Sequence, residues 1–238
     1  MDVRFGILGT GTVGKTIAAR LAGLGHEAMV GTRDPAETLS RTEPDAYGNP
    51  SFGVWQEEEH PEVKLGTFGE AAAHAEIVIN ATAGAVSMEA LEQAGEDDLS
   101  GKVLVDVSNP LDFSKGMPPT LSVSNTDSLG ERIQRRFPEA KVFKTLNTMN
   151  AALMVDPARL AGADHTVFVG GGDPEAKAAV TDLLRSFGRS DIVDLGDITT
   201  ARGTEMLLPV WLRLFGALQS PSSISRSSAD AFLVEGSP

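Results

Sequence analysis

Short apolar runs alternate with segments of helical periodicity along the first 150 residues of the 238-residue chain. Consecutive apolar residues predict buried strands, and apolar residues three or four positions apart predict helices that pack on them. Strands that alternate with helices form a parallel sheet through right-handed crossovers, so the pattern predicts an α/β fold with a Rossmann-type doubly wound parallel sheet over residues 1–150. The expected strands are 3–9, 27–32, 63–67, 77–82, 103–107 and 141–146, and the expected helices are 12–24, 70–74, 88–94 and 129–137.

The pattern changes after about residue 150 and predicts a smaller C-terminal α/β unit over residues 151–218. Strands are expected at 167–169 and 192–195, with a helix at 175–187 between them. Residues 205–218 are apolar on nearly all sides, which predicts a helix buried in the core or in a subunit interface. Pro209 predicts a kink or a restart in that helix. Residues 219–238 are expected to form a polar tail.

Helix starts and irregular segments are also marked in the sequence. Asp-Pro pairs at 34–35, 156–157 and 173–174 place a capping carboxylate before a proline in the first helical turn. Residues 42–62 include three consecutive glutamates and are expected to be an exposed, irregular insertion, and residues 111–124 are expected to be irregular as well.

A glycine motif lies between the first expected strand and the first expected helix. The pattern G-x-G-x-x-G in this context is typical of a dinucleotide site, because the glycines permit a tight turn, close approach of the pyrophosphate and close packing of the helix. The amide groups at the helix N-terminus then face the phosphates. The motif consists of Gly9, Thr10, Gly11, Thr12, Val13 and Gly14.

The end of the second expected strand favours NADP over NAD. NAD-binding domains usually have an acidic residue here for the ribose hydroxyls. This chain has Thr32 and Arg33 instead, and a guanidinium can bind a 2′-phosphate through two parallel hydrogen bonds. Asp34 could be interpreted as the ribose acid, but its place before Pro35 favours a capping role.

Three further strand ends are expected to face the cofactor, because ligands of such sheets bind beyond the carboxyl ends of the strands. Ala81, Thr82 and Ala83 are expected near the ribose and pyrophosphate. Turn capping or satisfaction of buried polar groups is an equally good interpretation of the other polar candidates. These are Asn109, which could bind the carboxamide, and Lys144 and Asn147, which could orient a second substrate.

Composition narrows the possible partners. The net charge of −13 argues against nucleic acid and against an anionic membrane surface, since both attract basic proteins. The absence of cysteine excludes disulfides and thiolate chemistry, and the four scattered histidines have no spacing typical of a metal site. No signal peptide or membrane span of about 20 apolar residues is evident, so a cytoplasmic location is expected.

No catalytic acid or base stands out, which favours one kind of redox chemistry. A dehydrogenase that acts on an alcohol usually needs a proton carrier beside the hydride. A reaction between two redox cofactors needs mainly alignment, because the cofactors supply the chemistry. The expected substrate is therefore a small molecule or a second cofactor.

The motifs together resemble the NADPH-dependent reductases of the deazaflavin coenzyme F420, over roughly residues 3–218. The residues that carry the resemblance are 9–14, 32–33, 80–82, 107–110 and 144–148. The resemblance implies NADP(H) as cofactor, direct hydride transfer to or from F420 in a cleft, and a homodimer. It also implies Thr10, Thr12 and Val13 at the pyrophosphate and nicotinamide, Thr32 and Arg33 at the 2′-phosphate, and Ala81 and Thr82 at the nicotinamide ribose.

Two alternatives remain open on the sequence. One is an NADPH-dependent reductase of another small acceptor, such as an imine, a carbonyl or a flavin. The other is a Rossmann protein that senses NADPH without turnover, which the missing catalytic groups allow.

Overall fold

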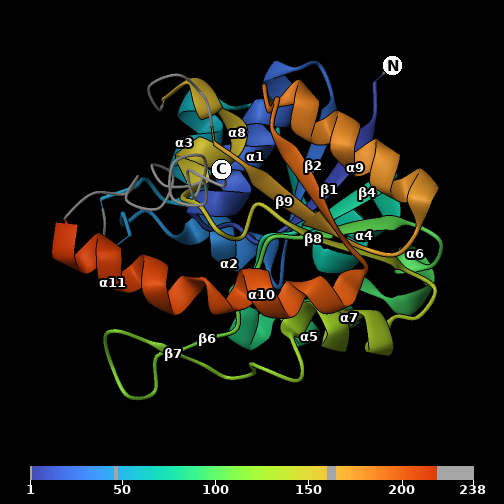
Figure 1. Ribbon diagram of the computed structural model, residues 1–238. Coiled ribbons are helices and arrows are strands. Elements are labelled where there is room, and N and C mark those ends of the chain that lie inside the picture. The colour runs from blue at the N-terminus through green and yellow to red at the C-terminus, as the bar shows by residue number, and fades with distance from the viewer. Residues whose placement is uncertain (1, 46–47, 160–164, 219–238) are drawn as a thin grey trace, which may run out of the picture.

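One eight-stranded sheet organises the molecule, with helices on both faces (Figure 1). The computed structural model describes residues 2–45, 48–159 and 165–218. The strand order is β10-β9-β8-β5-β4-β1-β2-β3. The strands are β1 (Arg4–Leu8), β2 (Glu27–Thr32), β3 (Lys64–Thr67), β4 (Ile77–Asn80), β5 (Val103–Asp106), β8 (Lys141–Thr145), β9 (Val167–Gly170) and β10 (Ile192–Gly196).

Strands β1, β2, β3, β4, β5 and β8 are parallel to one another. Strand β9 pairs antiparallel with β8, and β10 runs parallel to β9. The carboxyl ends of the six parallel strands therefore meet at one edge. The predicted Rossmann-type fold is confirmed. The two strands of the predicted C-terminal unit extend the same sheet, and a domain boundary at residue 150 stays a prediction.

Alternate residues of the central strands face opposite sides of the sheet and form two apolar clusters. Ile79 and Val105 belong to one cluster, and their neighbours Val78 and Leu104 belong to the other. Helices α1 (Thr12–Gly23), α3 (Phe52–Glu59), α8 (Ala151–Val155) and α9 (Pro174–Ser186) cover the first face. Helices α4 (Phe68–His74), α5 (Gly84–Ala94), α6 (Glu96–Leu99) and α7 (Leu129–Arg136) cover the second.

The remaining elements are short or lie at the ends of the sheet. They are α2 (Pro35–Ser40), the two-residue strands β6 (Leu111–Asp112) and β7 (Thr120–Leu121), the 3-10 turns Pro157–Arg159 and Ile198–Thr200, and the helices α10 (Ala201–Met206) and α11 (Leu208–Leu218). The segment 111–124 is largely irregular, as predicted, apart from the small β6–β7 hairpin. The predicted tail at 219–238 lies outside the described residues.

Two of the three predicted Asp-Pro caps are confirmed. The Asp34 carboxylate accepts a hydrogen bond from the Glu37 amide at the start of α2, and Asp173 accepts one from Ala176 at the start of α9. Asp156 precedes only a short 3-10 turn. The capping role of Asp34 leaves Thr32 and Arg33 as the polar residues at the end of β2 itself.

The prediction that residues 42–62 form an exposed, irregular insertion is wrong for the second half of the segment. Helix α3 occupies Phe52–Glu59, and Ser51 caps it through the amide of Val54. Phe52 and Trp55 are buried in the apolar cluster that contains α1, with their ring centroids 5.2 Å apart. The three consecutive glutamates made the segment look exposed, although its two aromatic residues have helical spacing. Packing of these aromatic residues against the core is what makes residues 52–59 a helix.

The helix expected over residues 205–218 is divided at Leu207, two residues before Pro209, as the restart prediction anticipated. Burial in the core of a single chain is wrong for most of it. Val210 is 56% exposed, and Met206, Leu207 and Phe215 are also exposed, whereas Leu208 is buried. Helix α11 extends away from the sheet at the lower left of Figure 1.

Replacement of Trp55 measures how firmly the 42–62 segment is joined to the core. Trp55 is 6% exposed, so Trp55→Ala should lower the free energy of unfolding by about 3–5 kcal/mol, as other large-to-small core changes do. Urea denaturation followed by circular dichroism measures the loss. Met117→Ala is the control, because Met117 is 72% exposed and should cost little. A cost below about 1 kcal/mol for Trp55→Ala would contradict a core role for α3.

Candidate functional site

Four loops meet at the carboxyl edge of the parallel strands. They follow β1, β4, β5 and β8 and contain residues 9–11, 81–83, 107–110 and 146–150. Backbone hydrogen bonds hold them to neighbouring strands: the Gly9 amide donates to Gly31, and the Ala81 amide donates to Leu8, each at 2.9 Å. This edge contains nearly all the site residues expected from the sequence, and it is where ligands of such sheets bind.

The glycine turn brings α1 close to the end of β1. Gly9 has a φ of 116°, a conformation that L-residues rarely adopt. A Cβ on Gly14 would lie 1.9 Å from the carbonyl oxygen of Gly9, so the helix could not pack this closely with any larger residue. A Cβ on Gly11, by contrast, would meet no described atom within 4 Å. The open space at Gly11 is where the motif lets a pyrophosphate approach the backbone.

The N-termini of α1 and α5 both face this edge without a side-chain cap among the described residues. Gly11 occupies the cap position of α1, and Ala83 occupies that of α5. Side chains cap several other helices, as in the reciprocal capping box of Thr67 and Glu70 at α4, although α6 and α10 also lack such a cap within the part of the chain that the structure describes. The amides at the start of α1 and α5 are thus left to bind an anion, and phosphate oxygens are suitable acceptors.

The end of β2 carries an exposed guanidinium. Arg33 donates a hydrogen bond to the Glu89 carboxylate of α5 at 3.1 Å, and the Arg33 side chain is 63% exposed. An exposed ion pair of this kind contributes little to stability, so Arg33 can exchange Glu89 for another anion at small cost. The hydroxyl of Thr32 lies 2.9 Å from that of Thr38 on α2.

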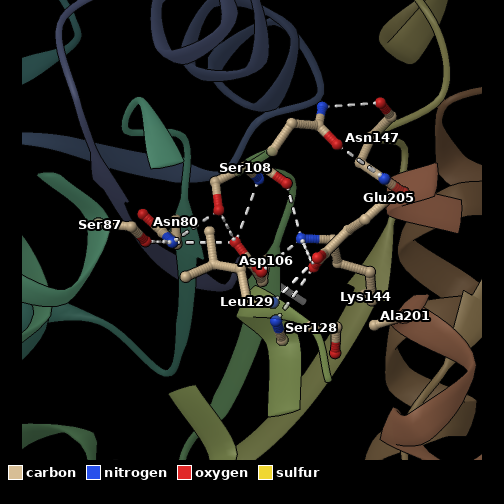
Figure 2. Close-up of polar contacts among 12 residues, drawn as sticks. Asn80, Ser87, Asp106, Ser108, Ser128, Leu129, Lys144, Asn147, Ala201 and Glu205 are labelled. Atoms are coloured by element: carbon tan, nitrogen blue, oxygen red, sulfur yellow. Dashed lines mark hydrogen bonds and ion pairs between the residues drawn. The ribbon is translucent and has the colours of Figure 1, made fainter. Parts of the chain in front are cut away.

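A buried ammonium lies beneath the four loops (Figure 2). Lys144, the fourth residue of β8, is 1% exposed. Its Nζ contacts Oδ2 of Asp106 at 2.8 Å, Oε1 of Glu205 at 2.9 Å and the carbonyl oxygen of Ser108 at 2.6 Å. These three contacts use all three N–H donors of the ammonium, so none is left for a substrate.

The second oxygen of Asp106 extends the network to the loop after β4. Oδ1 of Asp106 accepts hydrogen bonds from the amide and hydroxyl of Ser108 and from Nδ2 of Asn80, the last at 2.9 Å. Asn80 in turn accepts a hydrogen bond from the Thr82 hydroxyl at 2.7 Å. The loops after β4 and β5 are therefore fixed to one another through a buried carboxylate.

Glu205 joins helix α10 to the same network. Its carboxylate accepts hydrogen bonds from the amides of Leu129 and Gly130, at 2.9 and 3.1 Å, and so caps α7 from a distant part of the chain. The cluster holds two carboxylates against one ammonium. The partial positive charge of the α7 N-terminus offsets the excess negative charge.

The charge of Lys144 is secured by its neighbours. Burial alone would lower the pKa of Lys144, but the carboxylates of Asp106 and Glu205 outweigh it, and the pKa is raised above the usual 10.5. The side chain thus stays protonated at neutral pH and is not a general base. We regard Lys144 as a positioning residue, and the direct substrate contact anticipated from the sequence finds no free donor here.

Asn109 and Asn147 pair with each other at the same edge. Nδ2 of Asn109 donates to the carbonyl of Asn147 at 2.9 Å, and Nδ2 of Asn147 donates to Oδ1 of Asn109 at 3.0 Å. Leu146, with a φ of 60°, turns the chain between β8 and Asn147. The Asn109 amide uses one N–H donor and one acceptor position in this pair and retains one of each, so Asn109, which is only half-buried, can still bind a ligand at the surface.

Two residues of the network were not anticipated. Asp106 immediately precedes the Val107–Pro110 segment and could have been suspected from its place at a strand end. Glu205 gave no such signal, because it is 99 residues from Asp106 in sequence (205 − 106 = 99) and stands at the start of the apolar run 205–218. Only the folded chain shows that Glu205 contacts Lys144.

The described residues contain no helix long and apolar enough to cross a membrane. They also contain no group of three or more His, Cys, Asp or Glu side chains that could hold a metal ion.

The fold and the carboxyl edge of its parallel strands together define a dinucleotide-binding protein of the Rossmann class. A family model described as "NADP oxidoreductase coenzyme F420-dependent" matches residues 4–110. The crystal structure of an Arthrobacter sp. FB24 protein, assigned as an F420-dependent NADP reductase, is 62% identical with a TM-score of 0.89, covering 92% of this chain and 96% of that one. This chain belongs to the F420-dependent NADP oxidoreductase family.

The chain is also similar to two more distant relatives. The F420-dependent NADP reductase of Methanothermobacter marburgensis is 26% identical over 210 residues, which cover 87% of this chain and 89% of that one. The metalloreductase STEAP3 of Rattus norvegicus is 30% identical over 213 residues. That match covers 87% of this chain but 38% of STEAP3, so the two proteins share only this part.

Loss of the central cation tests the buried network. Lys144→Met would leave two carboxylates buried without their partner, and we expect it to lower the free energy of unfolding by about 3–5 kcal/mol at pH 7. The triple variant Lys144→Met, Asp106→Asn, Glu205→Gln removes the unpaired charges and should recover part of this loss. Urea denaturation measures both. A triple variant less stable than Lys144→Met would contradict the electrostatic explanation.

The same variant gives a pH signature. Because the pKa of Lys144 is raised in the folded state, its stabilising contribution is complete below 10.5 and is lost as the pH rises through the raised pKa. The difference in unfolding free energy between wild type and Lys144→Met should thus be constant from about pH 7 to pH 9 and shrink in stronger alkali.

Proposed function

We propose that this protein transfers a hydride between NADP(H) and the deazaflavin coenzyme F420. One observation carries the proposal beyond family membership. The segments 9–14, 80–84, 108–110 and 145–150, which form the nucleotide edge, contain no His, Asp, Glu, Lys, Tyr or Cys. Lys144 lies beneath them with all its donors used. Such an edge can align two rings but offers no residue to carry a proton, which suits transfer between two cofactors.

The residues of the edge fit NADP(H). The open space at Gly11 and the uncapped amides of α1 suit the pyrophosphate. We assign Gly9, Thr10, Gly11, Thr12, Val13 and Gly14 to the pyrophosphate and nicotinamide side, Thr32 and Arg33 to the 2′-phosphate, Ala81, Thr82 and Ala83 to the ribose, and Asn109 to the carboxamide. When bound, NADPH supplies the hydride and F420 accepts it, with the accompanying proton coming from solvent.

The chain's own contribution is rigidity. Asp106 and Asn80 fix the loop that carries Thr82, and the Asn109–Asn147 pair fixes the loop after β5. Because buried or partly buried hydrogen bonds hold both loops, little reorganisation is needed when the two rings come together. Asn147 acts in this proposal as a positioning residue, since it is 2% exposed.

An absorbance assay with NADPH and oxidised F420 tests the proposal directly. Loss of the deazaflavin band upon addition of the wild-type protein is the expected result. The matched variant is Gly11→Leu: its backbone torsions are ordinary and no described atom lies near its Cβ, so the fold should persist. The side chain would fill the pyrophosphate space, and the rate should fall at least tenfold at subsaturating NADPH.

The outcomes separate the alternatives. NADPH binding without turnover of F420, but with consumption of NADPH by an imine, a carbonyl or a flavin, would replace F420 by another acceptor. Binding without turnover of any acceptor would favour a sensor. Unchanged activity in Gly11→Leu would contradict the assigned pyrophosphate site.

We also propose that the protein is a homodimer through α11. The exposed apolar side chains of Met206, Leu207, Val210 and Phe215 lie on α10 and α11 or the residue between them. Trp211 and Phe215 stack with their centroids 5.6 Å apart. Apolar side chains gathered on a projecting helix are typical of a surface that a partner covers, and a second copy of the chain is the simplest one.

Light scattering coupled to size exclusion tests the dimer. The wild type is expected at twice the 25.0 kDa mass of the chain. Val210→Lys should shift it to the monomer, because a charge in an apolar interface is costly to desolvate. Leu24→Lys is the control, since Leu24 is exposed at the far end of α1. A monomeric wild type at working concentration would overturn the dimer.

A further inference from the structure

A small cavity of about 170 Å³ opens beside the glycine turn. Thr10, Gly11 and Thr12 form one wall, and Thr38 and Arg41 form another. The third wall is formed by residues 43, 45 and 50–52. A water molecule in the liquid occupies roughly 30 Å³, so the cavity has room for a phosphate group. Arg33, the arginine expected from the sequence at the 2′-phosphate, is not among its lining residues.

The cavity adjoins the end of β2. Thr38, in its wall, shares a hydroxyl–hydroxyl hydrogen bond of 2.9 Å with Thr32, the last residue of that strand. Dinucleotide-binding domains recognise the ribose 2′ position at the end of their second strand. A group attached at the 2′ position of a dinucleotide bound along Gly9–Gly14 would therefore point toward this cavity.

Two arginines flank the end of β2, each held by a carboxylate. Arg33 pairs with Glu89 on the α5 side, and Arg41 pairs with Glu37 on the α2 side. All four side chains are more than half exposed. Exposed pairs of this kind are worth little, and each arginine contacts its carboxylate through one nitrogen, so either can exchange it for a phosphate that it binds through two parallel hydrogen bonds.

The charges around the cavity make Arg41 necessary for an anion. Without Arg41, the charged groups in its walls are the carboxylates of Glu43 and Asp45 and the ammonium of Lys15, with a net charge of −1. The Lys15 ammonium is also hydrogen bonded to the carbonyl of Pro50. With Arg41 the four charges cancel, and a phosphate can enter without net repulsion from the lining.

We propose that Arg41 is a ligand of the NADP 2′-phosphate, and that Glu37 competes with the phosphate for it. Arg41 binds the phosphate from the α2 side, and Arg33 binds it from the α5 side. Glu37 then sets the affinity for NADP(H) without touching the cofactor. The inference rests on the proposed NADP site and adds the specificity-determining residues to it.

Isothermal titration of NADPH and of NADH, in the absence of any hydride acceptor, tests this assignment. Arg41→Ala should weaken NADPH binding about 10- to 100-fold, the range of a lost charged hydrogen-bonded contact, and leave NADH binding within twofold. Arg33→Ala should show the same selectivity. Glu37→Gln should strengthen NADPH binding about twofold, because the weak exposed ion pair between Glu37 and Arg41 no longer competes with the phosphate for Arg41.

Arg185→Ala is the matched control, since Arg185 is an exposed arginine of α9 paired with Asp182. It should leave both affinities unchanged. Equal losses for NADPH and NADH in Arg41→Ala, or no loss for either, would overturn the role of Arg41 while the NADP site itself stands. A wild-type protein with no preference for NADPH over NADH would overturn the NADP site and this inference together.

Discussion

The buried ammonium of Lys144 is the interaction on which the nucleotide edge depends. It joins β8 to Asp106 at the end of β5, to the backbone of Ser108 and to Glu205 of α10. Through Asp106 and Asn80 the same charge fixes the loop that carries Thr82. A charge is costly to bury unless all its donors are satisfied, so this geometry tolerates few alternatives. That intolerance keeps the loops after β4 and β5 in one arrangement.

The edge built on this network is polar, but its four loop segments contain no acidic or basic side chain that could transfer a proton. Its backbone amides and asparagine groups can bind phosphates and a carboxamide, while Lys144 beneath it is held as a cation. For hydride transfer between two cofactors, the protein mainly has to align the cofactors and exclude competing reactions. The absence of titrating residues in the four loop segments fits this chemistry better than it fits reduction of a carbonyl.

The proposed cofactor site gives the acidic character of the chain a local use. A protein with net charge −13 must still attract a dinucleotide that carries several phosphates. At the end of β2, Arg33 and Arg41 are each held by a surface carboxylate, Glu89 and Glu37. Such pairs keep the guanidinium groups ordered near the site and release them at small cost. Carboxylates placed beside a phosphate site can thus tune affinity instead of abolishing it.

The sequence by itself determined the Rossmann-type fold, the glycine turn and the capping role of Asp34 after β2. Each of these rests on a local pattern: apolar periodicity, a motif between a strand and a helix, and Asp34 before Pro35. The sequence could not determine that residues 52–59 form a helix anchored by Phe52 and Trp55, since three glutamates dominate that stretch. Nor could it show that Glu205 contacts Lys144 or that Arg41 faces the cavity beside Thr38. Those contacts join residues distant in the chain, and their energies depend on burial and distance, which only the tertiary structure decided.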